Sequence, residues 1–310
     1  MADGGDARVR LRRRTTLRRH ATPASARRAP VVAAAVALAG ALAAAGCAAA
    51  RSYVEPSGPL YETRHAPPPP ESGSASERLR VVTFNIEFAI HVDRAIEVLQ
   101  GTPELQGFDL LALQEMDAPG VERIARALGL NSFYAPGGVH PSTGRDHGCA
   151  LLSPWPLVDC RKLLLPHGSR GTGLRWAAVG ATLVRGPRRI RVYALHLPAP
   201  YAASGTSRRE QVDVLLDDAA GWPDPVLIAG DLNSHGIGDA FVARGYLWLT
   251  RDVGPSVAVA GVLRFSFDHV FARGLPVSAA FSSGVVRDNR KASDHHPVWA
   301  LVDLEGHLGT

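Results

Sequence analysis

Beyond its first fifty residues the chain lacks any excess of positive charge. Residues 1–50 contain nine arginines and only two acidic residues, Asp3 and Asp6, which gives this stretch a formal charge of +7. The whole chain carries +5, so residues 51–310 sum to about −2, with 25 basic against 27 acidic side chains. A domain that binds nucleic acid is usually strongly basic, and residues 51–310 do not meet that expectation.

Cysteine is also scarce, with only Cys47, Cys149 and Cys160 in the chain. Cys149 and Cys160 flank residues 153–156 (SPWP), which have the composition of a hairpin turn. In such a hairpin the two cysteines would lie opposite each other. Two interpretations stay open: a cross-strand disulfide in an oxidising compartment, or two buried free thiols.

Only residues 31–50 form a long uncharged apolar stretch, and they follow the arginine-rich start. This order is typical of an export signal. Ala44-Ala45-Gly46-Cys47 resembles the lipobox of bacterial lipoproteins, although Ala44 stands where leucine is usual; a diacylated Cys47 would then be the mature N-terminus. An uncleaved membrane anchor is the alternative, since twenty residues just cross a bilayer. Both predict an exported protein of the cell envelope, attached to the membrane through its N-terminal segment and facing outward.

The composition changes again after residue 50. Residues 51–77 contain four consecutive prolines followed by a serine- and glycine-rich run, which predicts a linker. Residues 78–310 are long enough for one hydrophobic core and show no internal repeat. We therefore expect a leader at 1–50, a linker at 51–77 and a single, monomeric domain at 78–310.

Hydrophobic periodicity in this domain predicts helices interspersed with strands. The expected helices are 92–100, 120–128 and 206–219, and the expected strands are 80–86, 108–113, 131–135, 148–153, 157–165, 226–229, 265–271 and 297–302. Residues 174–183 and 190–197 are expected to pair as a hairpin around Gly186-Pro187.

Polar side chains recur where the expected strands end. Residues 226–229 predict a strand buried on both faces, and Asp231 and Asn233 follow it on the same side of the chain. A carboxylate and a carboxamide placed together suit a divalent cation or a phosphoryl oxygen. Each residue alone is also explained as a turn, a cap or a buried partner. Several clustered acids, however, imply a cation among them, because unpaired buried acids are costly.

Six segments in order carry a resemblance to a known family: Thr83-Phe84-Asn85, Leu113-Gln114-Glu115, Ala194-Leu195-His196, Gly230-Asp231-Leu232-Asn233, Phe267-Asp268-His269-Val270 and Ser293-Asp294-His295-His296-Pro297. They resemble the motifs of the endonuclease/exonuclease/phosphatase superfamily, which has the deoxyribonuclease-I-like fold. The resemblance extends from about residue 79 to 303. It implies an α/β (α+β) fold, a four-layer sandwich of two mainly antiparallel β-sheets flanked by helices.

The resemblance also implies a metal site. Glu115 would hold Mg²⁺ or Mn²⁺, with Asn85 and Asp294 nearby. Hard oxygen ligands of this kind suit both ions.

The same resemblance implies catalytic roles for five residues. His295 would act as a general base on water, oriented by Asp268. Asp231 and Asn233 would position the phosphate and the attacking water. His196 would act as an acid or as a donor to the scissile phosphate.

Two positions near these motifs are less regular. Asp146 stands where the deoxyribonuclease branch has an acid that orients its histidine. Gly148-Cys149-Ala150 stands where many members have Gly-Asn-Ala, so a substrate contact from that asparagine is missing here.

These assignments predict an exported, divalent-metal-dependent phosphoesterase, first of all a phosphodiesterase or nuclease. The alternatives are a phosphatase, a phospholipid phosphodiesterase similar to sphingomyelinases, and a non-catalytic envelope protein on the same fold. Nucleic acid and phospholipid are thus the candidate substrates. For nucleic acid, a local basic rim would come from Arg145, Arg161, Lys162, Arg170, Arg175, Arg208 and Arg209.

Overall fold

The computed structural model describes residues 50–68, 78–223, 225–259, 262–275 and 281–303. The arginine-rich leader, Cys47 and nearly all of the apolar stretch at 31–50 lie outside these residues. Within the described ranges, no helix is both long and apolar enough to cross a membrane.

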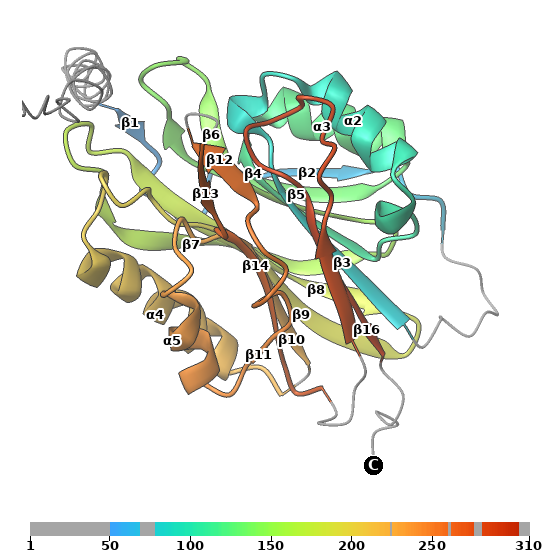
Figure 1. Cartoon of the computed structure of the whole chain (residues 1–310). Coiled ribbons are helices and arrows are strands. Elements are labelled where there is room, and N and C mark those ends of the chain that lie inside the picture. The colour runs from blue at the N-terminus through green and yellow to red at the C-terminus, as the bar shows by residue number, and fades with distance from the viewer. Residues whose placement is uncertain (1–49, 69–77, 224, 260–261, 276–280, 304–310) are drawn as a thin grey trace, which may run out of the picture. The chain divides into compact units, whose positions relative to one another are not determined.

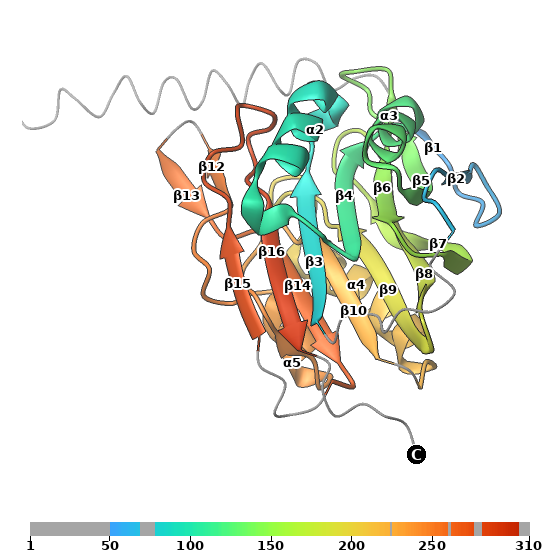
Figure 2. The same cartoon turned by 90° about the vertical axis from the view of Figure 1, so that its right-hand side faces the viewer.

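Two β-sheets form the centre of the described part (Figure 1). The first sheet has the order β1 (Arg51–Ser52), β5 (Asn131–Val139), β6 (Asp146–Ser153), β4 (Leu110–Met116), β3 (Arg78–Asn85), β16 (Val298–Asp303), β15 (Phe281–Val285), with β2 (Tyr61–Arg64) also paired to β5. In Figure 2 the molecule is viewed from the side of this sheet. Its strands are antiparallel except for the neighbours β3 and β4.

The second sheet has the order β11 (Leu247–Trp248), β14 (Asp268–Arg273), β10 (Val226–Asp231), β9 (Arg188–His196), β8 (Arg175–Arg185), β7 (Leu157–Gly168). Its only parallel pair among the described strands is β9 and β10. A small separate hairpin joins β12 (Val257–Val259) to β13 (Leu263–Phe265).

The hydrophobic core lies mainly between the two sheets. Val81 and Ala112 of the first sheet and Val192 and Leu227 of the second belong to one fully buried cluster. Alternate residues of these strands point the other way and are covered by helices. This explains why the central strands are apolar almost without interruption.

Helices cover the outer face of each sheet (Figure 1). α2 (Val92–Gly101) and α3 (Ala118–Leu128) pack on the first sheet, and α4 (Gly205–Ala220) and α5 (Gly238–Ala243) pack on the second. Two short 3₁₀ segments, η1 (Glu87–Ala89) and η2 (Pro103–Leu105), complete the described helices. The expected four-layer sandwich of two mainly antiparallel sheets is confirmed, as are the three expected helices and the hairpin formed by β8 and β9.

The hairpin expected around residues 153–156 is wrong. β6 pairs with β4 and β5 in the first sheet, whereas β7 pairs with β8 in the second. The chain therefore crosses between sheets at these residues, and Cys149 and Cys160 do not face each other across a ladder. Both are free thiols, and burial raises the pKa of each.

The expected linker at 51–77 needs correction at its N-terminal end. β1 and β2 lie in this segment and pair with β5. The hydroxyl of Tyr53 donates to Asp146 at 2.8 Å, and Lys162 Nζ donates to the carbonyl oxygens of Tyr53 and Gly58. These long-range contacts fix residues that by composition resemble a linker, so the folded domain begins before residue 78.

We expect Gly230→Ala to destabilise the protein by about 3 kcal/mol, because the new methyl group would overlap main chain. An added Cβ at Gly230 would lie 1.9 Å from the carbonyl oxygen of Leu195 in the neighbouring strand β9. Urea unfolding followed by circular dichroism measures the effect. The matched control is Gly205→Ala, where nothing lies within 4 Å of the added atom. Equal unfolding midpoints for the two variants would contradict the expectation.

Candidate active site

Strands from both sheets end at one place and bring their polar residues together. Asn85 ends β3, Glu115 lies near the end of β4, and His196 and Asp231 end the parallel neighbours β9 and β10. The amide nitrogen of Asn85 donates to Glu115 Oε1 at 3.1 Å and to Asp231 Oδ2 at 3.0 Å. This one side chain thus joins carboxylates that come from different sheets.

A histidine–carboxylate pair lies beside Asp231. Nδ1 of His295 is 2.8 Å from Oδ2 of Asp268, and Nε2 of His295 is 3.7 Å from Oδ2 of Asp231. Asn289 donates to the carbonyl oxygens of Ser293 and His295 and so fixes the loop that carries the imidazole. Burial alone would lower the pKa of His295, but the charges of Asp268 and Asp231 prevail and raise it well above its usual value.

Glu115 occupies a strained backbone position. The register between β4 and β6 shifts between Leu113 and Met116, and Glu115 has a φ of 59°. The main-chain nitrogen of Phe88 donates to its Oε2 at 3.1 Å. Burial raises the pKa of Glu115 to about 7. A left-handed backbone costs a non-glycine residue of order 1–3 kcal/mol, and such strain is concentrated at functional sites.

Asn233 is held in place by hydrogen bonds from its main-chain and side-chain nitrogens and by an arginine. Its nitrogen donates to Asp231 Oδ1 at 2.7 Å, its Nδ2 donates to the carbonyl oxygen of Leu197 at 2.9 Å, and its φ is 49°. Nη1 of the buried Arg208 donates to the Asn233 carbonyl oxygen at 3.1 Å. Arg208, which the sequence assigns to a basic rim, here supports Asn233.

His196 lies between polar and aromatic neighbours. Its Nε2 is 3.3 Å from Asn233 Nδ2 and 3.5 Å from Asp231 Oδ2, and the edge of Trp176 packs against its ring at a centroid distance of 4.6 Å. Burial lowers its pKa well below the usual value, so the imidazole is neutral. Asp146 accepts from Tyr53 instead of orienting His196, and the neighbour of His196 on that side is His147, with ring centroids 5.5 Å apart.

Acidic residues also mark the outer edge of the site. Asp294 is exposed, and its charge contributes to raising the pKa of Glu115. Burial and then the charge of Asp294 raise the pKa of Glu87, whose main-chain nitrogen donates to Asn85 Oδ1 at 3.0 Å. Glu87 and His147 are not among the residues selected from the sequence. The signals available were the spacing of two residues from Asn85 to Glu87 and the adjacency of His147 to Asp146.

The structure therefore gathers seven of the eight residues selected from the sequence and leaves the eighth, Asp294, at the edge. Two groups have ligand atoms within 4.8 Å of one another: Glu115 with His147 and His196, and Asp231 with Asp268 and His295. Glu115 is a largely buried carboxylate with a raised pKa, and Asp268 Oδ1 is buried without a hydrogen-bond partner among the described residues. Both features fit a centre that is completed by a divalent cation, since a cation would offset the cost of burying these groups.

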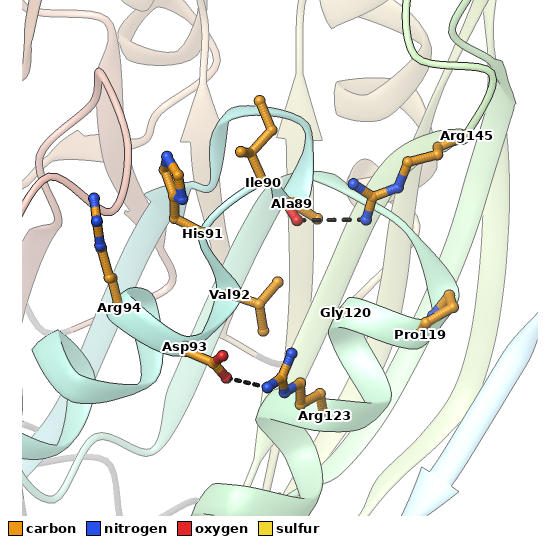
Figure 3. Close-up of a pocket in the computed structure, with 10 residues that line it drawn as sticks. All are labelled: Ala89, Ile90, His91, Val92, Asp93, Arg94, Pro119, Gly120, Arg123 and Arg145. Atoms are coloured by element: carbon orange, nitrogen blue, oxygen red, sulfur yellow. Dashed lines mark hydrogen bonds and ion pairs between the residues drawn. The ribbon is translucent and has the colours of Figure 1, made fainter.

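A pocket of about 300 Å³ lies beside the site, at the N-terminal ends of α2 and α3 (Figure 3). Arg94, Arg123 and Arg145 contribute to its lining, with Ile90 and His91. Arg145 reaches the carbonyl oxygen of Ala89 in η1, and Arg123 forms an ion pair with Asp93 at 2.5 Å. Asp93 also lines the pocket and Arg145 pairs with Asp117, so carboxylates offset part of its positive charge. The pocket lies next to the 3₁₀ segment that supports Glu115.

Comparisons with solved structures found the same fold in other proteins. An endonuclease/exonuclease/phosphatase from Beutenbergia cavernae matches with a TM-score of 0.59 and 23% identity, over 73% of this chain and 72% of that one. TDP2 from D. rerio, complexed with a single-strand DNA product, gives 0.56 and 17%, over 73% and 98%. Sphingomyelinase C from Streptomyces griseocarneus gives 0.53 and 20%, over 72% and 98%. At these identities the likeness establishes the fold alone.

Comparison with curated proteins found no match. The sequence does match the Endonuclease/Exonuclease/phosphatase family over residues 82–295, which span all six segments described above with the exception of the last two residues of the sixth. The resemblance is thereby confirmed: the chain belongs to the Endonuclease/Exonuclease/phosphatase family, whose members are phosphoester hydrolases that typically use a divalent metal ion.

Proposed function

We propose that this protein is an exported phosphodiesterase that depends on Mg²⁺ or Mn²⁺. The observation that carries the proposal is the bridge from Glu115 through Asn85 to Asp231, with the Asp268–His295 pair beside it. A carboxylate for a cation and an imidazole for a water molecule thus share one buried location. Their proximity is what in-line hydrolysis of a phosphoester requires.

Glu115 would hold the metal ion. Asn85 Oδ1 already accepts from Glu87 but keeps a second lone pair, and Asp294 stands at the edge of the site. These are oxygen ligands, which favour Mg²⁺ or Mn²⁺. When bound, such an ion polarises phosphoryl oxygens and stabilises their developing charge.

His295 would take the proton from the attacking water through Nε2, while Asp268 holds Nδ1. The charges of Asp268 and Asp231 raise the pKa of His295, which favours its protonated form when no cation is bound. Positive charge at Glu115 lowers the pKa of a neighbouring imidazole. With a cation held by Glu115, His295 would favour its neutral form, which is the form that accepts a proton.

His196 would contact the substrate as a neutral hydrogen-bond donor. Its lowered pKa argues against the alternative role of a proton-donating acid. Asp231 and Asn233 would orient the phosphate and the water beside it, and the contact from Arg208 keeps Asn233 in place.

The substrate class is best tested between nucleic acid and phospholipid. The expected basic rim gives little support to nucleic acid, because Arg145 and Arg161 pair with Asp117 and Asp218, and Lys162 is buried. In the pocket of Figure 3, Arg94 remains in favour of nucleic acid, whereas Arg123 pairs with Asp93.

One observation favours a phospholipid as the second candidate. The β12–β13 hairpin exposes Val262, Leu263 and Phe265, at 77%, 56% and 39%. It is joined to the active site by a bridge between Val257 and His295. Exposed apolar side chains beside a catalytic histidine suit a substrate presented at a membrane surface. The leader would hold a monomeric domain at the outer face of the same membrane.

A substrate panel tests the proposal. With Mg²⁺ or Mn²⁺ we expect hydrolysis of bis-(p-nitrophenyl) phosphate to exceed that of p-nitrophenyl phosphate, and EDTA to abolish both. Plasmid DNA, RNA and sphingomyelin vesicles are then compared directly. Faster hydrolysis of the monoester would favour a phosphatase, and no hydrolysis of any phosphoester would favour a non-catalytic envelope protein.

The double variant Leu263→Ser/Phe265→Ser separates the two substrate classes. If phospholipid is the substrate, we expect activity on vesicles to fall at least about tenfold, since two apolar side chains contribute roughly 1.5–3 kcal/mol each when buried. Activity on bis-(p-nitrophenyl) phosphate should not change. Equal losses on vesicles and on the soluble diester would show that the hairpin supports the fold and not membrane contact.

A further inference from the structure

A second set of potential metal ligands shares Glu115 but uses nitrogen donors. Glu115 comes from β4, His147 from β6 and His196 from β9, and one ligand atom of each lies within 4.8 Å of the others. His196 Nε2 is 3.8 Å from Glu115 Oε1. Three side chains from two sheets thus converge on a point beside the oxygen ligands assigned to Mg²⁺ or Mn²⁺.

Nothing in the catalytic arrangement explains His147. Its ring is 4% exposed and packs against Phe88, His140, Trp176 and His196. These contacts account for the faces and edges of the ring but not for its nitrogen atoms. None of the residues that the structure describes forms a hydrogen bond with the His147 imidazole.

One ring nitrogen of His196 also lacks a hydrogen-bond partner among the described residues. Nδ1 of His196 is buried without a hydrogen-bond partner among the described residues, and its side chain is 3% exposed. Burying a polar atom without a partner is costly, so Nδ1 of His196, beside the imidazole of His147, requires an explanation. A cation coordinated by the imidazoles would provide one.

We propose that Glu115, His147 and His196 form a binding site for a transition-metal ion of the Zn²⁺ type. Two imidazoles and one carboxylate, with a further position open, are a ligand set that Zn²⁺ uses in proteins. Imidazole nitrogen also favours Zn²⁺ and Co²⁺ over Mg²⁺, which prefers oxygen ligands.

The two metal sites share Glu115, so we expect the two ions to compete for its carboxylate. An ion held by His147 and His196 would also remove His196 from the phosphate. Zn²⁺ is therefore expected to act as an inhibitor that competes with Mg²⁺, and the site would make the protein responsive to transition metals. This consequence depends on the proposed function, whereas the binding site itself does not.

Metal binding by the full chain tests the site without any substrate. Isothermal titration of the metal-free protein with Zn²⁺, and the visible absorption of its Co²⁺ complex, report the ligand set. We expect His147→Gln to weaken Zn²⁺ binding at least about 100-fold and to change the Co²⁺ spectrum, since losing even a residue that only orients a ligand costs about 10–100-fold.

Two control variants make the test specific. His140→Gln removes the neighbouring imidazole, whose ring centroid is 5.4 Å from that of His147, and should leave Zn²⁺ affinity unchanged. Asp268→Asn alters the other group of candidate ligands and should also leave it unchanged. Circular dichroism melting curves check that each variant is folded, and His147→Asn replaces His147→Gln if the latter is not.

Equal Zn²⁺ affinity in the wild type and a folded His147 variant would overturn the proposal. A loss caused by Asp268→Asn instead would assign Zn²⁺ to the Asp231, Asp268 and His295 group and overturn it too. Zn²⁺ binding that depends on His147, in a protein that hydrolyses no phosphoester, would support this site and refute only the proposed function.

Discussion

Replacing His295 with glutamine should lower kcat on bis-(p-nitrophenyl) phosphate by about 10²–10⁴-fold, the usual contribution of a general base. Glutamine keeps polarity and size but cannot accept a proton from water at neutral pH. The KM of this variant should change little, because the lost interaction develops in the transition state. Steady-state kinetics at saturating Mg²⁺ measures both parameters.

Asp268→Asn should reproduce a large part of this loss. Asp268 Oδ2 accepts from His295 Nδ1 at 2.8 Å, and an amide in its place no longer stabilises the imidazolium that forms when the base takes a proton. The control is His235→Gln, because His235 lies near the motif of Asp231 but is exposed and directed to the carbonyl oxygen of Arg251. A loss in the His235 variant as large as that in the His295 variant would refute the assignment of the base.

Glu115→Gln should abolish metal-dependent activity and at the same time stabilise the metal-free protein above pH 7. Burial raises the pKa of Glu115 from 4.5 to about 7 in the folded state. The folded protein therefore binds more protons than the unfolded chain between these values, and its free energy of unfolding falls as pH rises through that range. The expected fall from this one group is on the order of 3 kcal/mol.

Urea unfolding in EDTA from pH 4 to pH 8 measures this dependence. Glutamine has no charge to bury, so the fall should become smaller in Glu115→Gln, while Mg²⁺ or Mn²⁺ should restore stability above pH 7 only in the wild type. Glu97→Gln is the matched control, since Glu97 is exposed and lies outside the site. Identical pH dependence in the wild type and Glu115→Gln would mean that Glu115 is not the buried metal ligand proposed here.

Much of the site could be predicted from the sequence because its residues follow apolar strands. Asn85, His196 and Asp231 each end a strand, and strands that end at one edge bring such residues together. The fold could be predicted from the ordered motifs. Hydrophobic periodicity alone does not indicate which sheet a strand joins. The wrong hairpin at residues 153–156 illustrates this, since a short proline-rich turn also allows the chain to cross between sheets.

Long-range contacts explain the other differences. β1 and β2 depend on β5 and on Lys162, which are distant in sequence, so residues 51–64 resembled a linker. His147 carries no motif of its own. Its significance comes from β6 lying close to β9, which places its ring beside that of His196.

In the proposed function, residues from both sheets surround one divalent cation next to the phosphoester. Anomalous diffraction from crystals grown with Mn²⁺ and inorganic phosphate tests it most directly. We expect a Mn²⁺ peak bonded to the carboxylate of Glu115, with phosphate between it and His295. A Mn²⁺ ion bound away from Glu115, or phosphate beyond the reach of His295, would contradict it.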